Sequence, residues 1–313
     1  MRPRWSLWVA SALLQSCAQT VPAPQPIIDM HLHAFAHDAY GDPAPPNEVT
    51  GRVPHYASDS VAMYATFDTL RRYGVVRAVA SGPPADVQRW RAANPAVILG
   101  GAYAGPRDSL RPIAELERLL AAGSVQVLGE LGLQYRGLAP SAPVLAPYWA
   151  LAVAHDVPVA IHTGLGDAGT PFGCCPQFRA RLGNPLLLED VLVKYPGLRV
   201  DVMHAGYPFL EETKALLTIY PDVYVDVGVL NWAIPRAEFH AYLKGLVDAG
   251  FANRVMFGSD QMVWPEAIGL AIDGINSAAF LTAAQKRGIF YDNAARFLRL
   301  TPADIARDHA AAR

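Results

Sequence analysis

The sequence predicts an α/β fold of the (β/α)₈ or TIM-barrel type, in which eight parallel strands form a closed ring surrounded by helices. From Ile27 onward, short runs rich in β-branched residues alternate with helical stretches, as in a parallel sheet with crossover helices. Eight such units in this length fit a closed barrel better than an open doubly wound sheet. No G-x-G-x-x-G motif follows the first strand, which disfavours a dinucleotide-binding fold.

Eight segments have the composition of strands buried on both faces, because they are dense in Val, Ile, Leu and Ala. We expect strands at 27–31, 75–81, 97–103, 125–131, 158–163, 198–204, 223–229 and 255–259. Helix signals lie between them: residues 60–63 precede Leu70, Pro112 opens 113–122, and Pro235 opens 236–249. Two further helical segments, 278–288 and 291–300, are expected to pack on the outside of the barrel.

Two long connections, 37–58 and 164–184, follow the first and fifth predicted strands. Both are expected at the end of the barrel where the strands finish. TIM barrels place their active sites there, and long loops act there as lids or substrate walls. The single barrel domain is expected to span residues 27–301, followed by a C-terminal tail at 302–313.

The first 18 residues are predicted to be a signal peptide. Arg2 and Arg4 precede an apolar run at 5–14 that is too short to span a bilayer as a mature helix. Residues 14–17, Leu-Gln-Ser-Cys, resemble a bacterial lipobox, while residues 16–18 also fit ordinary signal cleavage. We expect export to a bacterial envelope, as a periplasmic protein or as a lipoprotein anchored through Cys17. Residues 19–26, rich in proline, would form an extended tether.

Composition narrows the class of protein further. A chain of 313 residues with 52% hydrophobic content can bury a large core, which excludes global disorder. The net charge of −2 and the absence of any Lys or Arg run disfavour nucleic-acid binding, so a small-molecule substrate is expected. Beyond Cys17, only the neighbours Cys174 and Cys175 remain. Adjacent cysteines close a strained ring, so we expect no disulfide and predict that both are small, buried and inert.

Six residues of metal-ligating types lie at the ends of predicted strands. His31 and His33 end the first strand, whose period-two geometry points both toward the barrel mouth. The others end strands four, five, six and eight: Glu130, His162, His204 and Asp260. Singly, each has an ordinary explanation, such as a helix cap, a turn or a hydrogen bond to a carbonyl. Together, four histidines and two carboxylates in an apolar mouth would be costly to desolvate unless a metal or a proton network paired them.

The motifs around these residues resemble those of the amidohydrolase superfamily, and within it the amidohydrolase-related branch. The resemblance runs from residues 28–33, Ile-Asp-Met-His-Leu-His, through 195–200 to 291–298. It implies that His31, His33 and Asp260 hold one metal, that His162 and His204 hold a second, and that Glu130 bridges the two. Residues 129–133, Gly-Glu-Leu-Gly-Leu, are also similar to the strand-four glutamate motif of TatD-type hydrolases.

Many members of this branch hold a single metal, and some are decarboxylases in which the strand-six histidine acts as an acid or base. Glu130 favours two metals and hydrolysis, because a bridging carboxylate neutralises two neighbouring cations. The alternative role for Glu130 is to orient a histidine by hydrogen bonding. A mononuclear decarboxylase therefore stays the alternative function, and a non-catalytic envelope binding protein is a third hypothesis.

The expected reaction is hydrolysis of an amide, ester or lactone bond of a small molecule. The nucleophile would be a metal-bound hydroxide, since a divalent cation lowers the pKa of bound water toward neutrality. Asp260 is the predicted proton acceptor and donor, and His204 would be the base if one ion is bound. Imidazole and carboxylate ligands suit Zn²⁺, with manganese, iron or nickel as alternatives, and we expect two ions per chain, or one in the mononuclear alternative.

Four side chains near the mouth are candidate substrate contacts: Tyr103, Arg136, Phe172 and Trp232. With Tyr135, Asn231 and Trp264 they would form a mainly aromatic wall suited to an aromatic or moderately apolar substrate. Arg136 could pair with a substrate carboxylate. All of these could equally be packing at the barrel rim, and the sequence does not indicate an oligomeric state.

Overall fold

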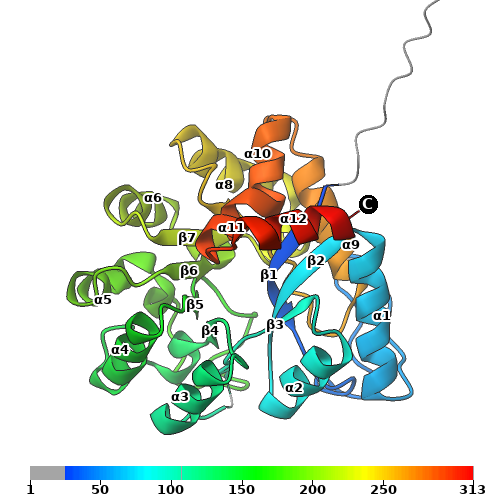
Figure 1. The fold of residues 1–313 in the computed structure, drawn as a ribbon, viewed down its shortest axis with the longest axis horizontal. Coiled ribbons are helices and arrows are strands. Elements are labelled where there is room, and N and C mark those ends of the chain that lie inside the picture. Colours follow the sequence, from blue (N-terminus) through cyan, green and yellow to red (C-terminus); the bar gives the residue numbers. More distant parts are fainter. Residues whose placement is uncertain (1–24, 107, 313) are drawn as a thin grey trace, which may run out of the picture.

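The computed structural model describes residues 25–106 and 108–312, and it places eight parallel strands at the centre with helices around them (Figure 1). Seven strands lie within the predicted ranges, and the first extends two residues further. The strands are β1 (Ile27–His33), β2 (Val75–Ser81), β3 (Ile98–Gly100), β4 (Leu128–Leu131), β5 (Val159–His162), β6 (Val200–Met203), β7 (Val223–Asp226) and β8 (Val255–Met256).

At least one helix follows each strand, as the alternating pattern predicts. The Ser58 side chain caps α1 by accepting a hydrogen bond from the Val61 amide, and Pro112 and Pro235 directly precede α3 and α8. The helices around the strands are α1 (Asp59–Arg72), α2 (Pro84–Ala93), α3 (Ile113–Ala121), α4 (Ala146–Ala154), α5 (Glu189–Lys194), α6 (Leu210–Ile219), α7 (Leu230–Ala233), α8 (Arg236–Asp248) and α9 (Glu266–Asn276).

The strands form two parallel sheets, β1-β2-β3 and β4-β5-β6-β7-β8. Between β8 and β1, the Met30 amide donates to the Phe257 carbonyl at 2.9 Å, and between β3 and β4 an isolated bridge pairs Gly101 with Val127. The parallel α/β fold is therefore confirmed, but the eight strands do not form one continuous closed sheet. The backbones on the two sides of this break still lie close together: the Ala102 amide donates to the Val127 carbonyl at 2.9 Å, and a Cβ on Gly101 would lie 2.5 Å from the Gly129 carbonyl oxygen.

Strand side chains alternate between two apolar clusters, as period-two geometry requires. On β5, Val159 and Ile161 belong to the larger cluster, which includes helix residues such as Leu216 of α6. Ala160, between them, belongs to the smaller cluster inside the ring of strands. Because both faces are apolar, the strands have few polar positions, and those at their ends stand out.

The segment after α9 closes one end of the ring. It contains α10 (Ala283–Arg287), a π-helical turn (Gly288–Asp292) and α11 (Asn293–Phe297). Tyr291, Ala294 and Phe297 pack into the inner cluster with strand residues such as Met30. The segment predicted on the outside at 291–300 therefore contributes instead to the bottom of the core, opposite the strand ends that carry the candidate ligands. The segment predicted at 278–288 does lie outside, because α10 has no buried residue and Ala278 and Leu281 belong to the larger cluster.

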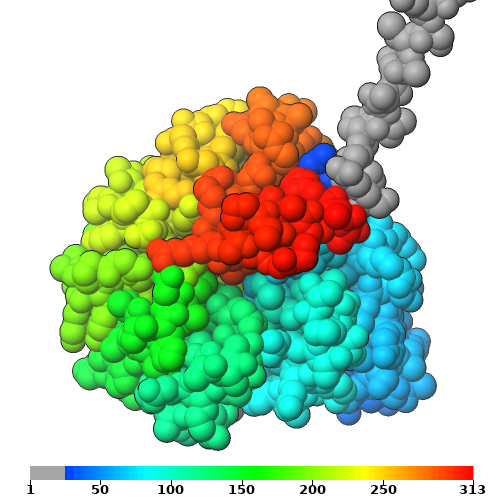
Figure 2. Space-filling model, in the orientation of Figure 1, coloured from blue at the N-terminus to red at the C-terminus, as the bar shows by residue number. Residues whose placement is uncertain are grey.

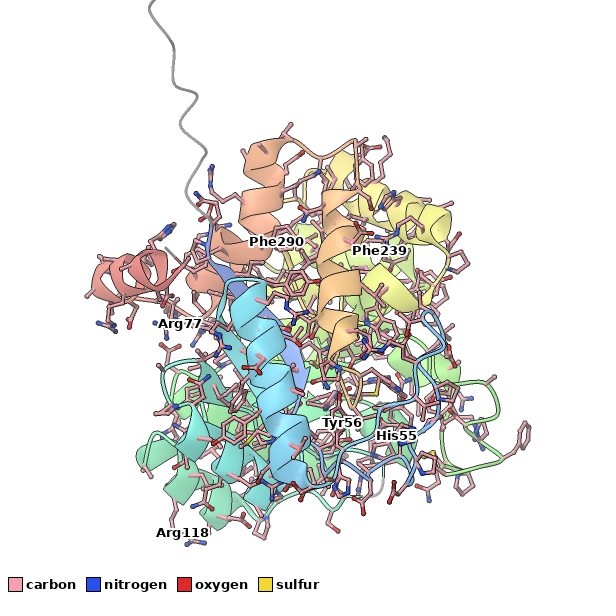
Figure 3. All side chains as sticks on the ribbon, turned by 90° about the vertical axis from the view of Figure 1, so that its right-hand side faces the viewer. His55, Tyr56, Arg77, Arg118, Phe239 and Phe290 are labelled. Atoms are coloured by element: carbon pink, nitrogen blue, oxygen red, sulfur yellow. A yellow bond between two sulfur atoms is a disulfide. The ribbon has the colours of Figure 1, made fainter. Side chains whose placement is uncertain are left out.

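Residues 302–311, predicted as part of a tail, form helix α12 (Pro302–Ala311). Thr301 and Asp304 make a capping box at its start. Arg77 Nε of β2 donates to both carboxylate oxygens of Asp308, at 2.7 and 3.0 Å. The C-terminal segment lies across the face shown in Figure 2, and Figure 3 shows Arg77 beside its last helix. The tail prediction is wrong for this helix, because an ion pair attaches it to the sheet.

Cys174 and Cys175 form a disulfide, contrary to the prediction that neighbouring cysteines stay reduced. Cys175 is buried, whereas Cys174 is exposed. Tight turns surround the pair: the Phe172 amide donates to the Gly169 carbonyl, and the Cys175 amide to the Thr170 carbonyl. These turns bring two adjacent side chains together, which an extended segment would not do.

The predicted signal peptide, lipobox and most of the tether lie outside the described residues. Within the described ranges, no helix is long and apolar enough to cross a membrane.

Candidate metal centre

The structure brings all six predicted ligands together where the strands end. His31 and His33 lie on β1, Glu130 on β4 and His162 on β5. His204 follows β6 directly, and Asp260 lies four residues after the end of β8. All six side chains are buried. They come from five strands whose carboxyl ends lie at the same end of the barrel, so parallel topology explains their convergence.

One group of atoms gathers around Asp260. His33 Nε2 lies 3.0 Å from Asp260 Oδ1, and His31 Nε2 lies 3.3 Å from the same oxygen. The second Glu130 oxygen, Oε2, is 3.3 Å from His33 Nε2 and 3.6 Å from His31 Nε2. Two imidazole nitrogens and two carboxylate oxygens therefore face a common point.

A second group lies on the other side of Glu130. His162 Nδ1 is 2.6 Å from Glu130 Oε1 and 3.0 Å from His204 Nε2. Glu130 thus turns one oxygen toward the β1 histidines and the other toward His162, which is the arrangement a bridging carboxylate would have.

These residues fit divalent cations. Three triplets have ligand atoms within 4.8 Å of one another: His31, His33 and Glu130; His31, His204 and Asp260; Glu130, His162 and His204. The facing nitrogens of His162 and His204 are both potential lone-pair donors, and only a proton or a cation between them makes such an approach favourable. His31 Nε2 is fully buried without a hydrogen-bond partner of good geometry, although two carboxylates surround it. Nitrogen and oxygen donors of this kind suit zinc and related metals.

Backbone strain accompanies two of these positions. His204 has φ of 58° and Asp260 has φ of 51°, in the left-handed region that residues with side chains seldom occupy. Each such position costs about 1–3 kcal/mol and persists only where surrounding contacts hold it. At His204 and Asp260 the strained backbone turns the side chain into the cluster.

The charges of the cluster act strongly on one another. Burial opposes protonation of His31, but the carboxylates of Asp260 and Asp226 outweigh it and raise the pKa of His31 well above its usual range. Burial would raise the pKa of Glu130, yet the hydrogen bond from His162 and the neighbouring charge of His31 hold it well below its usual range. Burial, with the neighbouring His162, lowers the pKa of His204. His204 therefore stays neutral and able to donate a lone pair.

Sequence reasoning missed three buried carboxylates near this end of the barrel. Asp226 ends β7 and lies 3.3 Å from His31 Nδ1. Asp29 accepts hydrogen bonds from the His31 and Ser259 amides, and burial raises its pKa to about 6. Asp201 of β6 is fully buried, and burial together with Asp226 raises its pKa well above its usual range. A single acidic residue within each apolar strand was the signal available for all three.

The predicted substrate contacts have different surroundings. The Tyr103 ring packs edge-on against His33 with a centroid distance of 5.7 Å, and it also contacts Phe35. Tyr135 packs against His162 at 4.8 Å. These two tyrosines lie directly beside the cluster, on opposite sides of Glu130, and burial raises the pKa of both.

The other predicted contacts do not meet at this point. Trp232 is buried and its Nε1 donates to the Ser259 carbonyl at 2.7 Å. Arg136 donates to the Asp108 carbonyl through Nη1. Phe172 is 93% exposed, and no described contact joins it to the cluster. Asn231 and Trp264 donate to the carbonyls of Gly258 and Pro45, which gives both a packing role.

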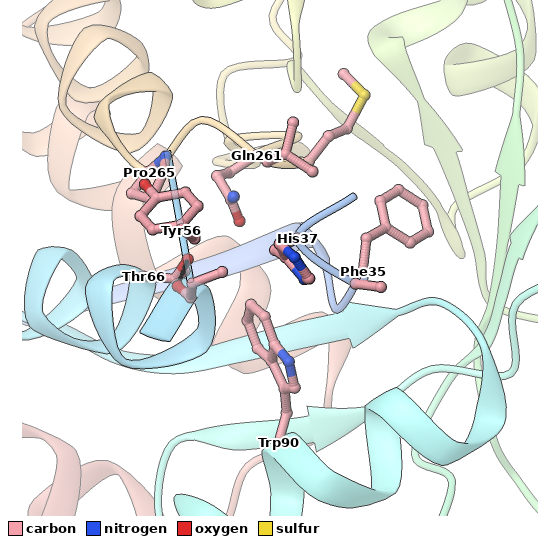
Figure 4. A pocket seen from close by; sticks show the side chains of 11 residues that line it. Phe35, His37, Tyr56, Thr66, Trp90, Gln261 and Pro265 are labelled. Atoms are coloured by element: carbon pink, nitrogen blue, oxygen red, sulfur yellow. Dashed lines mark hydrogen bonds between the residues drawn. The ribbon is translucent and has the colours of Figure 1, made fainter. Parts of the chain in front are cut away.

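A small pocket lies beside the cluster, between α1, α2 and the segments that follow β1 and β8 (Figure 4). His37, Tyr56, Trp90 and Gln261 are among its lining residues. His37 Nδ1 is 2.8 Å from Asp59 Oδ1, so the loop after β1 is attached to the start of α1. Arg89 also contacts Asp59, at 3.2 Å, and its positive charge makes this corner unfavourable for a cation.

The fold and the cluster define a metal-dependent enzyme built on parallel βα units. The chain belongs to the amidohydrolase family, whose model matches residues 28–300, and this confirms the resemblance seen in the sequence. Protein fluG of Emericella nidulans is 27% identical over 114 residues, which are 36% of this chain and 12% of that protein. The chain therefore corresponds to a small part of that relative's length.

Solved structures share the fold. A protein described as "probable 2-pyrone-4,6-dicarboxylic acid hydrolase" from Acinetobacter baumannii, with citric acid bound, aligns with a TM-score of 0.60. Its identity is 16%, over 88% of this chain and 99% of that one. The 5-carboxyvanillate decarboxylase of Sphingomonas paucimobilis aligns with a TM-score of 0.58 and 16% identity, over 89% of this chain and 100% of that one. Proteins with this fold are thus described both as a probable hydrolase and as a decarboxylase, so the fold alone does not determine the reaction.

Proposed function

We propose that this protein is a hydrolase that uses two divalent cations, Zn²⁺ being the metal its donors suit best, to cleave an amide, ester or lactone of a small molecule. The observation that carries this proposal is the position of Glu130. Its Oε1 lies 2.6 Å from His162 Nδ1, while its Oε2 lies 3.3 Å from His33 Nε2. A carboxylate placed between two sets of nitrogen donors is suited to join two cations.

In this proposal His31, His33 and Asp260 hold one cation, His162 and His204 hold the other, and Glu130 contacts both. Bound divalent cations supply a Lewis acid that polarises a substrate carbonyl and lowers the pKa of water. Asp260 Oδ1 is the oxygen that faces His31 and His33, and Oδ2 lies 3.9 Å from His204 Nδ1, so Oδ2 would be the oxygen that takes a proton from water and returns it to the leaving group. Tyr103 and Tyr135 exclude water on either side.

Metal content tests this proposal directly. We expect close to two ions per chain in the purified protein by elemental mass spectrometry, falling to one or fewer in Glu130→Ala. Hydrolysis of an amide, ester, lactone and phosphoester panel should disappear with the second ion. One ion in both proteins would contradict the bridged site.

A decarboxylase is the second candidate, favoured by the structural similarity to 5-carboxyvanillate decarboxylase. It would use one ion, with His204 as the acid or base. Carbon dioxide release from aromatic carboxylic acids, with one tightly bound ion per chain, would support it over hydrolysis.

The aromatic surroundings of the cluster indicate a class of substrate, and the N-terminal sequence indicates a location for the protein. The aromatic side chains beside the cluster suit an aromatic or moderately apolar substrate, because Phe35, Tyr103 and Tyr135 form its nearest wall. We also propose export to a bacterial envelope, on the strength of Arg2, Arg4 and the short apolar run that follows them.

A further inference from the structure

The turn after β7 contributes no proposed ligand, yet it contacts two of them. We propose that Asp226 and Gly228 are positioning residues that hold His31 and His204 with Nδ1 protonated and Nε2 free for metal. This inference rests on the proposed function, since it assigns a role in the same site. The two residues would act through hydrogen bonds to the histidines and would not contact the substrate.

Asp226 acts on His31. Both carboxylate oxygens of Asp226 lie 3.3 Å from His31 Nδ1, on the side of the ring opposite Nε2. His31 Nε2 faces Asp260 and Glu130. A carboxylate can only accept a hydrogen bond, so Asp226 places the proton on Nδ1 and leaves Nε2 as the donor atom. Metal-bound histidines usually have such a partner on their second nitrogen.

Gly228 acts on His204 through its backbone. Its carbonyl oxygen lies 3.0 Å from His204 Nδ1, and a carbonyl also only accepts. His204 Nε2 then faces His162 Nδ1 and, at 4.0 Å, Glu130 Oε1. Two residues apart on one turn, Asp226 and Gly228 therefore select the same ring tautomer in histidines from two different strands.

The turn itself is held in place. The Gly228 amide donates to Asp226 Oδ1 at 2.6 Å, which fixes the carboxylate relative to the carbonyl that follows. No side chain fits at Gly228, because a Cβ would lie 2.8 Å from both Asp226 Oδ1 and His31 Nδ1. Gly258 of the β8 end is similarly close, since a Cβ there would lie 2.7 Å from His31 Cβ and 2.9 Å from Asp226 Oδ1. Two glycines thus let the carboxylate and the imidazole meet.

Burial makes a purely structural role for Asp226 unfavourable. Its side chain is fully buried, and a carboxylate without a charged or protonated partner is costly there. Among the described residues, His31 is the side chain that forms a hydrogen bond or ion pair with Asp226. Orienting a ligand gives a reason for keeping this charge in the barrel.

The test compares Asp226→Asn with Asp201→Asn. Asp201 is an equally buried carboxyl on the neighbouring strand β6, and no described hydrogen bond joins it to His31 or His204. In Asp226→Asn the Gly228 amide still needs an acceptor, so the new NH₂ group is left facing His31 Nδ1 and favours the wrong tautomer. We expect Asp226→Asn to weaken Zn²⁺ binding about 10- to 100-fold in competition titrations with a chromogenic chelator. Asp201→Asn should bind within about twofold of the wild type.

Side-chain ¹⁵N spectra of the Zn²⁺-loaded wild-type protein give a second readout that needs no variant. We expect His31 and His204 each to keep a proton on Nδ1 with Nε2 bound to metal. Equal Zn²⁺ affinity in both variants, or metal on Nδ1 of His31, would overturn this inference while leaving the proposed function intact. A wild-type protein that binds no Zn²⁺, Mn²⁺, Fe²⁺ or Ni²⁺ would overturn both.

Discussion

Helix α12 offers a stability test at the end of the barrel opposite the metal cluster. Arg77 and Asp308 join β2 to this helix, with side chains only 13% and 7% exposed. Replacing Arg77 by Met keeps most of the apolar stem but leaves the Asp308 carboxylate nearly buried without its cation. Removing one partner of a buried pair costs about 3–5 kcal/mol. The Tyr291 hydroxyl still donates to Asp308 at 2.8 Å, so we expect the lower end, about 3 kcal/mol.

Thermal unfolding followed by circular dichroism measures this cost. At roughly 2 °C per kcal/mol for a domain of this size, Arg77→Met should lower the midpoint by about 6 °C. Arg307→Met is the matched control, since Arg307 pairs with Asp304 on the same helix but is 68% exposed. Such an exposed pair contributes less than about 1 kcal/mol. Equal midpoints for the two variants would refute the view that α12 is attached through a buried pair, and metal affinity should be unchanged in both.

Three further predictions address the site, the loop after β1 and the N-terminus. Asp260→Asn should abolish turnover with little change in metal content, because an amide cannot take the proton; full turnover in this variant would exclude the proton role of Asp260. The hydrogen bond to Asp59 raises the pKa of His37 above 6.5, and the one from His37 lowers the pKa of Asp59 below 3.8. The pair therefore contributes stability between these values, which is lost as pH rises through the folded pKa of His37 or falls through that of Asp59. A double-mutant cycle of His37→Ala and Asp59→Ala should give a larger coupling at pH 5.5 than at pH 8.5, and equal couplings would contradict this. Cys17→Ser should move the expressed protein from the membrane fraction to the soluble periplasmic fraction if residues 14–17 are a lipobox, and an unchanged distribution would favour ordinary signal cleavage.

The order of strands and helices was predictable because parallel strands buried on both faces leave a strong apolar pattern. The lengths of β3 and β8 were not. β8 contains two residues, although the apolar run suggests five. Phe257 directly follows it, and its amide donates to the Ile289 carbonyl of the π-helical turn at 2.8 Å instead of to a neighbouring strand, so a contact distant in sequence, and not local composition, accompanies the end of β8.

The C-terminal helix shows a different limit. Thr301, Pro302 and Asp304 are a recognisable helix N-terminus signal in the sequence. What the sequence does not display is the partner: Arg77 lies more than two hundred positions earlier and points to the bottom of the barrel. A short polar helix without a visible apolar face is therefore easily mistaken for a tail.

The candidate ligands were predictable from their position at strand ends, whereas their supporting residues were not. Asp226 ends β7 just as His162 ends β5, and Glu130 lies one residue before the end of β4. A single carboxylate on a strand without other ligand types, however, has many ordinary explanations. Only its 3.3 Å contacts with His31 distinguish it. The disulfide between Cys174 and Cys175 likewise depends on the turns around it, which spacing alone does not specify.

The negative charge of Asp226 adds to that of the two ligand carboxylates, and the total charge bears on how many metal ions the site holds. Glu130, Asp260 and Asp226 all lie within 3.6 Å of a His31 nitrogen, so three carboxylates share one desolvated region. One divalent ion leaves a negative charge there, which a protonated histidine must balance. Two ions leave a positive charge, which suits an anionic nucleophile or a polarised carbonyl. In the metal-free protein, protonated histidines balance part of this negative charge, so metal binding should release protons. Calorimetry in buffers of different ionisation enthalpy measures how many protons are released per ion. This number distinguishes a site with one ion from a site with two.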